Sequence, residues 1–322
     1  MNNLFKPLVL LSLWGSQTCA FVGSTIPPRP PSSLALSYLE SLQTQTQVTE
    51  PTPAVSGPLA TVGGASPVNG APPAAATERL GFCHVPMEYF GLDKLSSKGP
   101  RATFDWGAPQ DWSRKLADDG EFRAGSWYCS EGGWASPKGK AVTEVFYVLS
   151  GYGCLGDADG VKHYFGPGDV VVIPKGHTGR WDVNEPIHKV WAVNDHPRVE
   201  EQSTPIRVRV DHYNTFASQY MVDTSGNDPL YGDTVPAKSA TNTLYNIGPT
   251  KVGVWSCEKG SFQVHHGARS WFHMLEGVLF VTDASDGNCR RCVAGDTVML
   301  PEGWYGWVDV IEPAKKVWVT AA

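Results

Sequence analysis

The chain has 322 residues, of which 41% are hydrophobic, enough to fill the cores of two domains of ordinary size. Its 32 acidic and 26 basic residues give a formal net charge of −6, and no long run of like charge occurs. A nucleic-acid partner is therefore not expected, because phosphate binding requires clustered Lys and Arg.

The first residues have the pattern of a signal peptide rather than of a folded domain. Lys6 precedes an apolar stretch from Pro7 to Trp14, and the small residues around Ala20 suit cleavage by a signal peptidase. The apolar stretch is too short to span a bilayer. We expect residues 1–20 to be removed and the mature protein to carry no transmembrane segment.

Residues 21–78 are rich in Ser, Thr, Pro and Ala and poor in charge, and they begin with Phe21. This arrangement resembles the two-part plastid-targeting sequence of algae with secondary plastids, such as diatoms, and it implies a chloroplast location. The alternative is secretion, or delivery to an endomembrane lumen. The stretch Leu34–Leu42 is a candidate short amphipathic helix, either a docking peptide or part of the transit peptide. Pro51–Thr77 is predicted to be a disordered linker.

The remainder of the chain is a duplication. Three motifs recur at an offset of 128 residues for the first and 127 for the other two. They are Gly125–Gly132 with Gly253–Gly260, Gly168–Gly176 with Gly295–Gly303, and Glu185–Trp191 with Glu312–Trp318. Each copy is long enough to bury a core of its own. We predict one domain over residues 79–194 and a second over 195–322, with a long connection from Asp195 to Thr250.

Both copies are predicted to be all-β. Their apolar residues come in short runs rich in Val, Ile, Phe, Tyr and Trp, bounded by Gly, Pro and Asp, with no sustained helical period. In the first copy we expect strands near 124–129, 142–150, 152–156, 161–165, 170–173, 178–183 and 187–194. In the second copy we expect them near 252–257, 261–266, 270–276, 278–283, 288–292, 297–300, 305–310 and 314–320. Many short strands at regular spacing favour sandwiches or jelly-roll barrels.

These motifs resemble those of the cupins, and more narrowly of the ureidoglycine-aminohydrolase-like cupin subgroup. The shared features are a Trp-x-Cys strand, a Leu-x-Gly turn, a Gly-Asp-x4-Pro-x-Gly block and a closing Glu-Pro-x-x-Lys-Val-Trp strand. The resemblance implies two tandem jelly-roll barrels of the RmlC-like type, a bicupin. It also implies that the two barrels pack as an intrachain pseudo-dimer.

The resemblance implies a metal site as well, held by an H-x-H pair, a glutamate and a later histidine. The sequence departs from this pattern in both copies. The four positions read Lys138, Lys140, Glu144 and Gly179 in the first copy, and Val264, His266, Ser270 and Gly306 in the second. An ammonium cannot ligate a cation, so we expect no cofactor, although a divalent metal held by other ligands stays open.

The substitutions suggest a polar cavity in the first barrel. If Lys138, Lys140 and Glu144 share the inward face, with Arg180 and Trp181 near the barrel mouth, the cavity could hold an anion or a sugar-like ligand. An inward lysine beside a carboxylate could also act as a base or a Schiff-base nucleophile. The alternative is that both lysines lie on a solvated loop, from Gly132 to Lys140, and that Glu144 pairs with one of them.

In the second barrel the ligand-binding candidates are His266, Trp304 and Tyr305. Cys289 and Cys292 are predicted to point to opposite faces of one strand, so their spacing does not indicate a metal or redox site. With the metal pattern lost, the expected function is small-molecule binding or a structural role. The alternative is a cupin-type hydrolase or isomerase that uses a polar or metal-containing cavity.

Overall fold

The computed structural model describes residues 82–197, 205–214, 222–223 and 238–322. The predicted signal peptide, transit peptide, helix and linker lie outside these residues. Within them the regular secondary structure is strand, apart from the short 3₁₀ turns η1 (Met87–Phe90) and η2 (Leu92–Lys94). No helix in the described part of the chain is long and apolar enough to cross a membrane.

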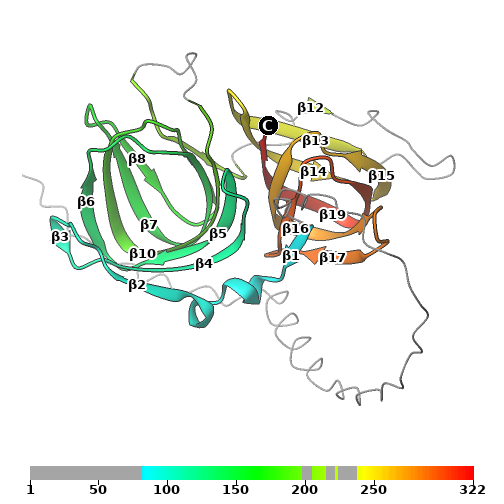
Figure 1. Ribbon diagram of the computed structural model, residues 1–322, viewed down its shortest axis with the longest axis horizontal. Helices are drawn as coiled ribbons and strands as arrows, with labels where there is room; N and C mark the ends of the chain where they lie inside the picture. Colours follow the sequence, from blue (N-terminus) through cyan, green and yellow to red (C-terminus); the bar gives the residue numbers. More distant parts are fainter. Residues whose placement is uncertain (1–81, 198–204, 215–221, 224–237) are drawn as a thin grey trace, which may run out of the picture. The chain divides into compact units, whose positions relative to one another are not determined.

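The first barrel is a ten-stranded antiparallel sheet with the strand order β11-β9-β7-β10-β5-β4-β2, to which β3, β6 and β8 are added at the side. Its strands curve around a common interior, as Figure 1 shows in cyan and green. The strands are β2 (Ser96–Pro100), β3 (Trp106–Gly107), β4 (Gln110–Asp118), β5 (Phe122–Cys129), β6 (Gly132–Ser136), β7 (Thr143–Asp157), β8 (Lys162–Phe165), β9 (Asp169–Ile173), β10 (Gly179–Asn194) and β11 (Arg209–His212).

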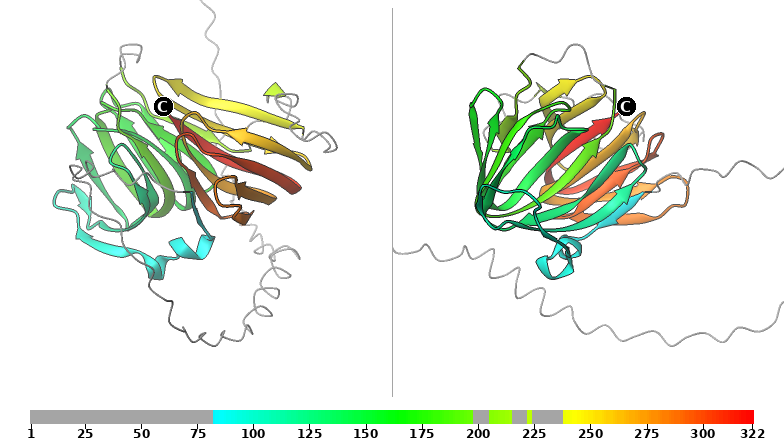
Figure 2. Two further views of the ribbon diagram at one scale, coloured as in Figure 1. Left: turned by 45° about the vertical axis from the view of Figure 1, so that its right-hand side comes forward. Right: turned by 60° about the vertical axis from the view of Figure 1, so that its left-hand side comes forward.

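The second barrel is a nine-stranded sheet with the order β1-β18-β16-β19-β14-β13-β12, and with β15 and β17 at the side. The same curvature is visible in both views of Figure 2. The strands are β1 (Cys83–Val85), β12 (Val222–Asp223), β13 (Ser239–Ile247), β14 (Thr250–Cys257), β15 (Gly260–His265), β16 (Arg269–Asp283), β17 (Cys289–Val293), β18 (Thr297–Leu300) and β19 (Tyr305–Ala321). The predicted all-β class with two jelly-roll barrels is confirmed.

The strand alternation of the sequence decides which residues fill each barrel. On β9, Val171 and Ile173 belong to a buried cluster inside the first barrel, whereas Val170 and Val172 belong to a cluster on the other face of the sheet. This other cluster also contains buried residues of the second barrel, such as Trp271. A third cluster, which includes Val298 and Leu300, fills the second barrel.

Several strand boundaries differ from those expected. Two predicted pairs in the first copy are the single long strands β7 and β10, which continue through bulges, and β16 and β19 do the same in the second copy. The region Gly132–Lys140 was expected to be a loop, but its first half is the strand β6. The outer strand of each barrel also comes from a segment without a repeated motif: β11 pairs with β9, and β1 pairs with β18.

Candidate functional site

A charged cluster lies inside the first barrel, where one carboxylate is shared by two lysines. Glu144 follows the start of β7 and Lys189 lies in the second half of β10. The Lys189 Nζ atom donates a hydrogen bond to Oε1 of Glu144 at 2.7 Å, and Lys140, from the loop before β7, donates to Oε2. Lys189 is only 3% exposed. A buried ammonium of this kind requires a counter-charge, which Glu144 supplies.

Aromatic rings surround the Lys189 ammonium on its other sides. Its Nζ atom lies 3.8 Å from the ring centroid of Phe146 and 4.6 Å from those of Trp127 and Trp181. Trp134 stacks on Trp181, with ring centroids 5.9 Å apart. Ring faces attract a cation through their quadrupole, so these rings stabilise the ammonium and form apolar walls beside it.

Burial and charge act against each other in this cluster. Burial alone would raise the pKa of the Glu144 carboxyl, but the ammoniums of Lys140 and Lys189 outweigh it and hold that pKa well below its usual range. Burial also lowers the pKa of Lys189 to about 8, against the opposing charge of Glu144. At neutral pH the cluster therefore consists of an ionised carboxylate and two ammoniums.

The cluster forms part of the wall of a cavity of about 320 Å³. The cavity is lined by Arg101, Ser113, Arg123, Trp127, Trp134, Lys140, Glu144, Trp181, Lys189, Trp191 and Val193. Arg101 lies over the ring of Trp134, 3.8 Å from its centroid, and its guanidinium approaches Asp111 at 3.5 Å. Four cationic side chains thus face a single carboxylate across the cavity, which gives the site a positive potential.

The structure brings together three of the candidates predicted in the first barrel and leaves two outside. Lys140, Glu144 and Trp181 line the cavity. Lys138 is exposed on the loop after β6, as the solvated-loop alternative expected, whereas Lys140 of the same loop reaches the cavity. Arg180 was expected at the mouth but does not line the cavity; it neighbours the inward-facing Trp181 on β10 and therefore points to the other face.

The outward direction of Arg180 is fixed by two carboxylates. Its guanidinium donates hydrogen bonds to Asp105 at 2.9 and 3.1 Å and to Asp182 at 2.5 and 2.7 Å. The hydrogen bonds that Arg180 donates to Asp182 and then to Asp105 raise the pKa of Arg180 further above its ordinary value. The side chain is fully engaged, and it has no part in the cavity.

Sequence reasoning missed Lys189, although a signal for it was present. Lys189 and Lys316 occupy the same place in the repeated Glu-Pro-x-x-Lys-Val-Trp motif. In the second barrel the Lys316 Nζ atom lies 4.1 Å from the ring centroid of Phe272 and 4.7 Å from that of Trp255. Lys189 lies two residues after Ile187 and two before Trp191 on a predicted strand, so the three share one face. A lysine that alternates with apolar residues in this way could have been recognised as an inward-facing cation.

The second-barrel candidates lie in different environments. His266 is half-buried beside Trp304, with ring centroids 6.0 Å apart, while its neighbour His265 is exposed, as strand alternation predicts. Burial, followed by the charge of Lys316, lowers the pKa of His266 to about 4. The imidazole is therefore neutral at physiological pH.

Trp304 was proposed to be a ligand-binding residue, but it is mainly a core residue. It is 4% exposed, and its Nε1 atom donates a hydrogen bond to Asp283 at 3.0 Å. Tyr305, next in the chain, is 44% exposed. Both residues line a surface depression of about 620 Å³ together with Phe82 and Arg290. Tyr305 is therefore the freer of the two for contact with a ligand.

The residues at the cupin metal positions do not fit a metal ion. Around Glu144, two ammoniums take both carboxylate oxygens and add positive charge where a cation would have to bind. No group of three or more His, Cys, Asp or Glu that could hold a metal occurs in the described residues. We derive no reaction step through a metal.

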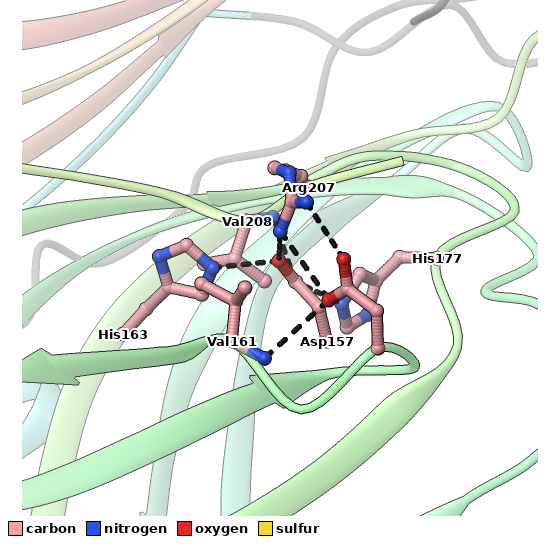
Figure 3. A network of polar contacts seen from close by, with 7 residues as sticks. Asp157, Val161, His163, His177, Arg207 and Val208 are labelled. Carbon is pink, nitrogen blue, oxygen red and sulfur yellow. Dashed lines mark hydrogen bonds and ion pairs between the residues drawn. The ribbon is translucent and has the colours of Figure 1, made fainter. Parts of the chain in front are cut away.

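A second polar cluster surrounds Asp157 at the end of β7 (Figure 3). Its carboxylate accepts hydrogen bonds from His163 at 2.8 Å, His177 at 2.9 Å and Arg207 at 3.1 Å, and from the backbone N–H of Val208 at 3.2 Å. His177 is buried in this network. The cluster attaches the segment that leads into β11 to the end of β7, which indicates a structural role.

The cysteines behave as core or surface residues. Cys129 and Cys257 are buried at equivalent strand positions, and burial raises the pKa of each thiol to about 12. Cys289 is exposed and Cys292 is buried, so the two point to opposite faces of β17, as predicted. All of the cysteines in the described part of the chain are free thiols.

Comparison with known proteins identifies the fold. The family model of the EutQ-like cupin domain matches residues 116–191 and 246–318, one match in each barrel. No curated protein matches the chain in sequence.

Three solved structures resemble most of the chain. A DUF861 protein of unknown function from Pseudomonas syringae pv. tomato DC3000 is 14% identical, with a TM-score of 0.58 over 75% of this chain and 99% of that one. Ylba from E. coli, also DUF861, is 12% identical, with a TM-score of 0.52 over 77% and 95%. The putative glyoxylate-induced protein from Pseudomonas aeruginosa is 15% identical, with a TM-score of 0.54 over 79% and 93%.

Identities this low show a shared fold and leave the activity of this chain open. The two family matches fall on the two halves of the duplication, and the similar structures cover both halves. Each barrel therefore contains one segment that is similar to the EutQ-like cupin domain, and the chain has the fold of two cupin barrels in tandem.

Proposed function

We propose that the first barrel is a metal-free receptor for a small organic anion, with a carboxylate as the expected chemical class. The observation that supports this is the cavity of about 320 Å³ in which four cationic side chains face one carboxylate. Its volume suits a small ligand, and its tryptophan walls suit an apolar or aromatic body attached to the anionic group.

Arg101 is the residue best suited to test this proposal, because it lines the cavity without contacting Glu144. Benzoate and other small carboxylates would be titrated into the protein by calorimetry at low and high salt. We expect Arg101→Met to weaken binding about tenfold, the worth of one charge-assisted hydrogen bond. Binding should also weaken with salt. Arg209→Met on β11, exposed and outside the cavity, is the matched control. Equal affinities for wild type and Arg101→Met would reject the receptor.

A substitution of Glu144 gives a second test, in which ligand binding should become stronger rather than weaker. Its carboxylate competes with a bound anion for the ammoniums of Lys140 and Lys189. Glu144→Gln should therefore increase the thermal stabilisation that a carboxylate ligand provides. Identical shifts in the variant and the wild type would show that the ligand does not occupy this cavity.

The second candidate function is a cupin-type hydrolase or isomerase, in the manner of the ureidoglycine-aminohydrolase-like subgroup. The observation that favours it is Lys189, an amine whose pKa burial lowers to about 8, paired with a carboxylate beside the cavity. Such a pair is suited to proton transfer near neutral pH. Conversion of a bound ligand, followed by NMR and abolished in Lys189→Met, would favour the enzyme; recovery of the ligand unchanged favours the receptor.

We also propose that the protein is delivered to a plastid of a secondary-plastid alga. The support is the signal-peptide pattern followed by Phe21 and a Ser/Thr/Pro/Ala-rich segment. Residues 1–78 fused to a fluorescent protein should accumulate in the plastid, and Phe21→Ala should stop the last import step. Accumulation of the wild-type fusion in the secretory pathway would support the secreted or luminal alternative.

A further inference from the structure

The two barrels present one duplicated lysine in the same setting. Lys189 pairs in register with Trp127 on the neighbouring strand, and Lys316 pairs with Trp255. Each Nζ atom lies over the ring of that tryptophan and over the ring of a phenylalanine, Phe146 in the first barrel and Phe272 in the second. The inward direction and the aromatic cage of this lysine are thus common to both barrels.

The ionic partners of this lysine are present in one barrel only. In the first barrel Glu144 is paired with Ile173 and Val193 on its two neighbouring strands. In the second barrel the equivalent residues, Leu300 and Thr320, are paired with Ser270. Ser270 therefore stands at the position of Glu144, and His266 at that of Lys140. Among the described residues Lys316 makes no ion pair, and its Nζ atom lies over the two rings.

The titratable groups nearest Lys316 are neutral at physiological pH. Burial raises the pKa of Cys257 on β14 and of Cys292 on β17 to about 12, and burial lowers the pKa of His266 after β15 to about 4. None of these groups offers a negative charge to an ammonium. Burial accordingly lowers the pKa of Lys316 to about 8. Lys316 is nevertheless only half-buried, so part of its side chain remains open to solvent.

We propose that Lys316 is a nucleophilic amine in the second barrel and that it condenses with a small apolar aldehyde or ketone. The arrangement meets the two needs of such a site: an amine free of hydrogen bonds to a carboxylate, and apolar walls, formed by Trp255 and Phe272, for the body of the substrate. Lys189 is excluded from this chemistry because Glu144 binds its ammonium.

The reaction is a condensation and needs no oxidant or reductant. The lone pair of the Nζ atom attacks the carbonyl carbon and forms a C–N bond, and one proton passes from the nitrogen to the carbonyl oxygen, which becomes a hydroxyl group. The nitrogen then gives up its second proton and forms the C=N bond, while the C–O bond breaks and the hydroxyl group takes up a proton and leaves as water. One amine and one carbonyl compound give one imine and one water.

The test is reductive trapping in the full-length protein with propanal, a neutral aldehyde. Sodium cyanoborohydride reduces the imine to a stable secondary amine, which peptide mass spectrometry locates. At pH 7.5 we expect Lys316 to be modified at least about tenfold faster than the exposed Lys251, because the free-amine fraction of an ordinary lysine is small at that pH. The rate at Lys316 should rise with pH up to about 8 and then level off.

Two substitutions exchange the ionic partners of the duplicated lysines. Glu144→Gln should raise the modification rate of Lys189, and Ser270→Glu should lower that of Lys316 by supplying a carboxylate. In Lys316→Met the rates at all other lysines should be unchanged. Modification of Lys316 at the same rate as Lys251 in the folded wild-type protein would overturn the proposal, whether or not the variants fold.

This inference is independent of the receptor proposed in the first barrel. Propanal carries no charge and should not compete with a carboxylate for Arg101. Trapping at Lys316 without any carboxylate binding would reject the receptor alone, and carboxylate binding without trapping at Lys316 would reject the amine site alone.

Discussion

The Nζ atom of Lys189 lies 2.7 Å from Oε1 of Glu144, inside a barrel that resembles the cupins, whose metal pattern places an ion beside the corresponding glutamate. The carboxylate that would ligate a cation is instead bound by Lys189 and by Lys140. The interior of the first barrel is therefore positively charged through side chains alone. Removal of any one of the three charged side chains of this cluster should affect the stability of the protein as well as ligand binding.

Glu144→Gln should destabilise the protein by about 3 kcal/mol, because it leaves buried ammoniums without a counter-charge. Urea unfolding followed by tryptophan fluorescence measures this change. Glu131→Gln, on the exposed turn before β6, is the matched control and should lie within about 0.5 kcal/mol of wild type. A destabilisation no larger than that of the control would contradict the buried cluster.

The Glu144 contribution should also depend on pH. The folded-state pKa of Glu144 lies below its unfolded value, so its stabilising effect is present above the unfolded pKa and is lost as pH falls through the folded pKa. The difference in free energy of unfolding between wild type and Glu144→Gln should therefore be constant from about pH 6 to 7 and shrink in acid. A difference that persists unchanged to pH 2 would argue against ionisation of Glu144.

Lys316→Met should stabilise the protein at neutral pH. The pKa of Lys316 is about 8 in the folded protein, below the ordinary value of 10.5. The folded protein therefore binds this proton less tightly than the unfolded chain does. The resulting loss of folding stability is complete below about pH 8 and is relieved as pH rises from about 8 to 10.5. The melting temperature of Lys316→Met should exceed that of wild type at pH 7, and the gap should narrow by pH 10. A lower melting temperature for the variant at pH 7 would contradict the unpaired ammonium.

Asp157→Asn should loosen the segment that contains Arg207 and Val208 (Figure 3). Burial raises the pKa of Asp157, but hydrogen bonds from His163 and His177 outweigh it and lower that pKa, so its contribution is lost only in acid. Limited proteolysis at pH 7 should cleave the variant after Arg207 faster than the wild type. The control is Asp159→Asn, which removes only the more exposed partner of Arg207. Equal cleavage of all three proteins would show that Asp157 does not hold this segment.

Gly151→Ala should be strongly destabilising, because Gly151 combines a φ of +84° with a crowded site. A Cβ atom there would lie 2.0 Å from the carbonyl oxygen of Pro186. Gly277 in the second barrel repeats the arrangement, with a φ of +80° and Pro313 at 2.1 Å. Gly160→Ala, with a φ of +87° and nothing within 4 Å, separates backbone strain from the clash. Similar unfolding midpoints for Gly151→Ala and Gly160→Ala would show that the close approach is absent.

The sequence predicted what the duplication and strand alternation determine. The repeated glycines and prolines marked the turns, and the apolar runs marked most strands that both copies share, such as β9 and β18. The strands β4 and β11 were missed because neither carries a repeated motif. β4 pairs with the adjacent strand β5, whereas the partner of β11, the strand β9, lies further away in sequence. β11 acquires its place only by pairing with β9, which no local pattern indicates.

Only part of the candidate site was predicted from the sequence. Glu144 and Lys140 could be placed because the cupin pattern names their positions, whereas Lys189 corresponds to no ligand in that pattern. Arg180 was misplaced because strand alternation shows only that Arg180 and Trp181 point to opposite faces. Which of the two points into the barrel depends on the packing of Trp181 against Trp134. The charge balance of the cavity, to which Arg101 contributes from outside the duplicated motifs, follows from the fold alone.

We infer that the first barrel binds an organic anion through its own cationic side chains. Calorimetric titration of a small carboxylate into chelator-treated protein of verified metal content tests it most directly. We expect the same affinity before and after metal removal and a loss of affinity in Arg101→Met. Binding that disappears on chelation and returns with one equivalent of Mn, Fe, Ni or Zn would contradict it.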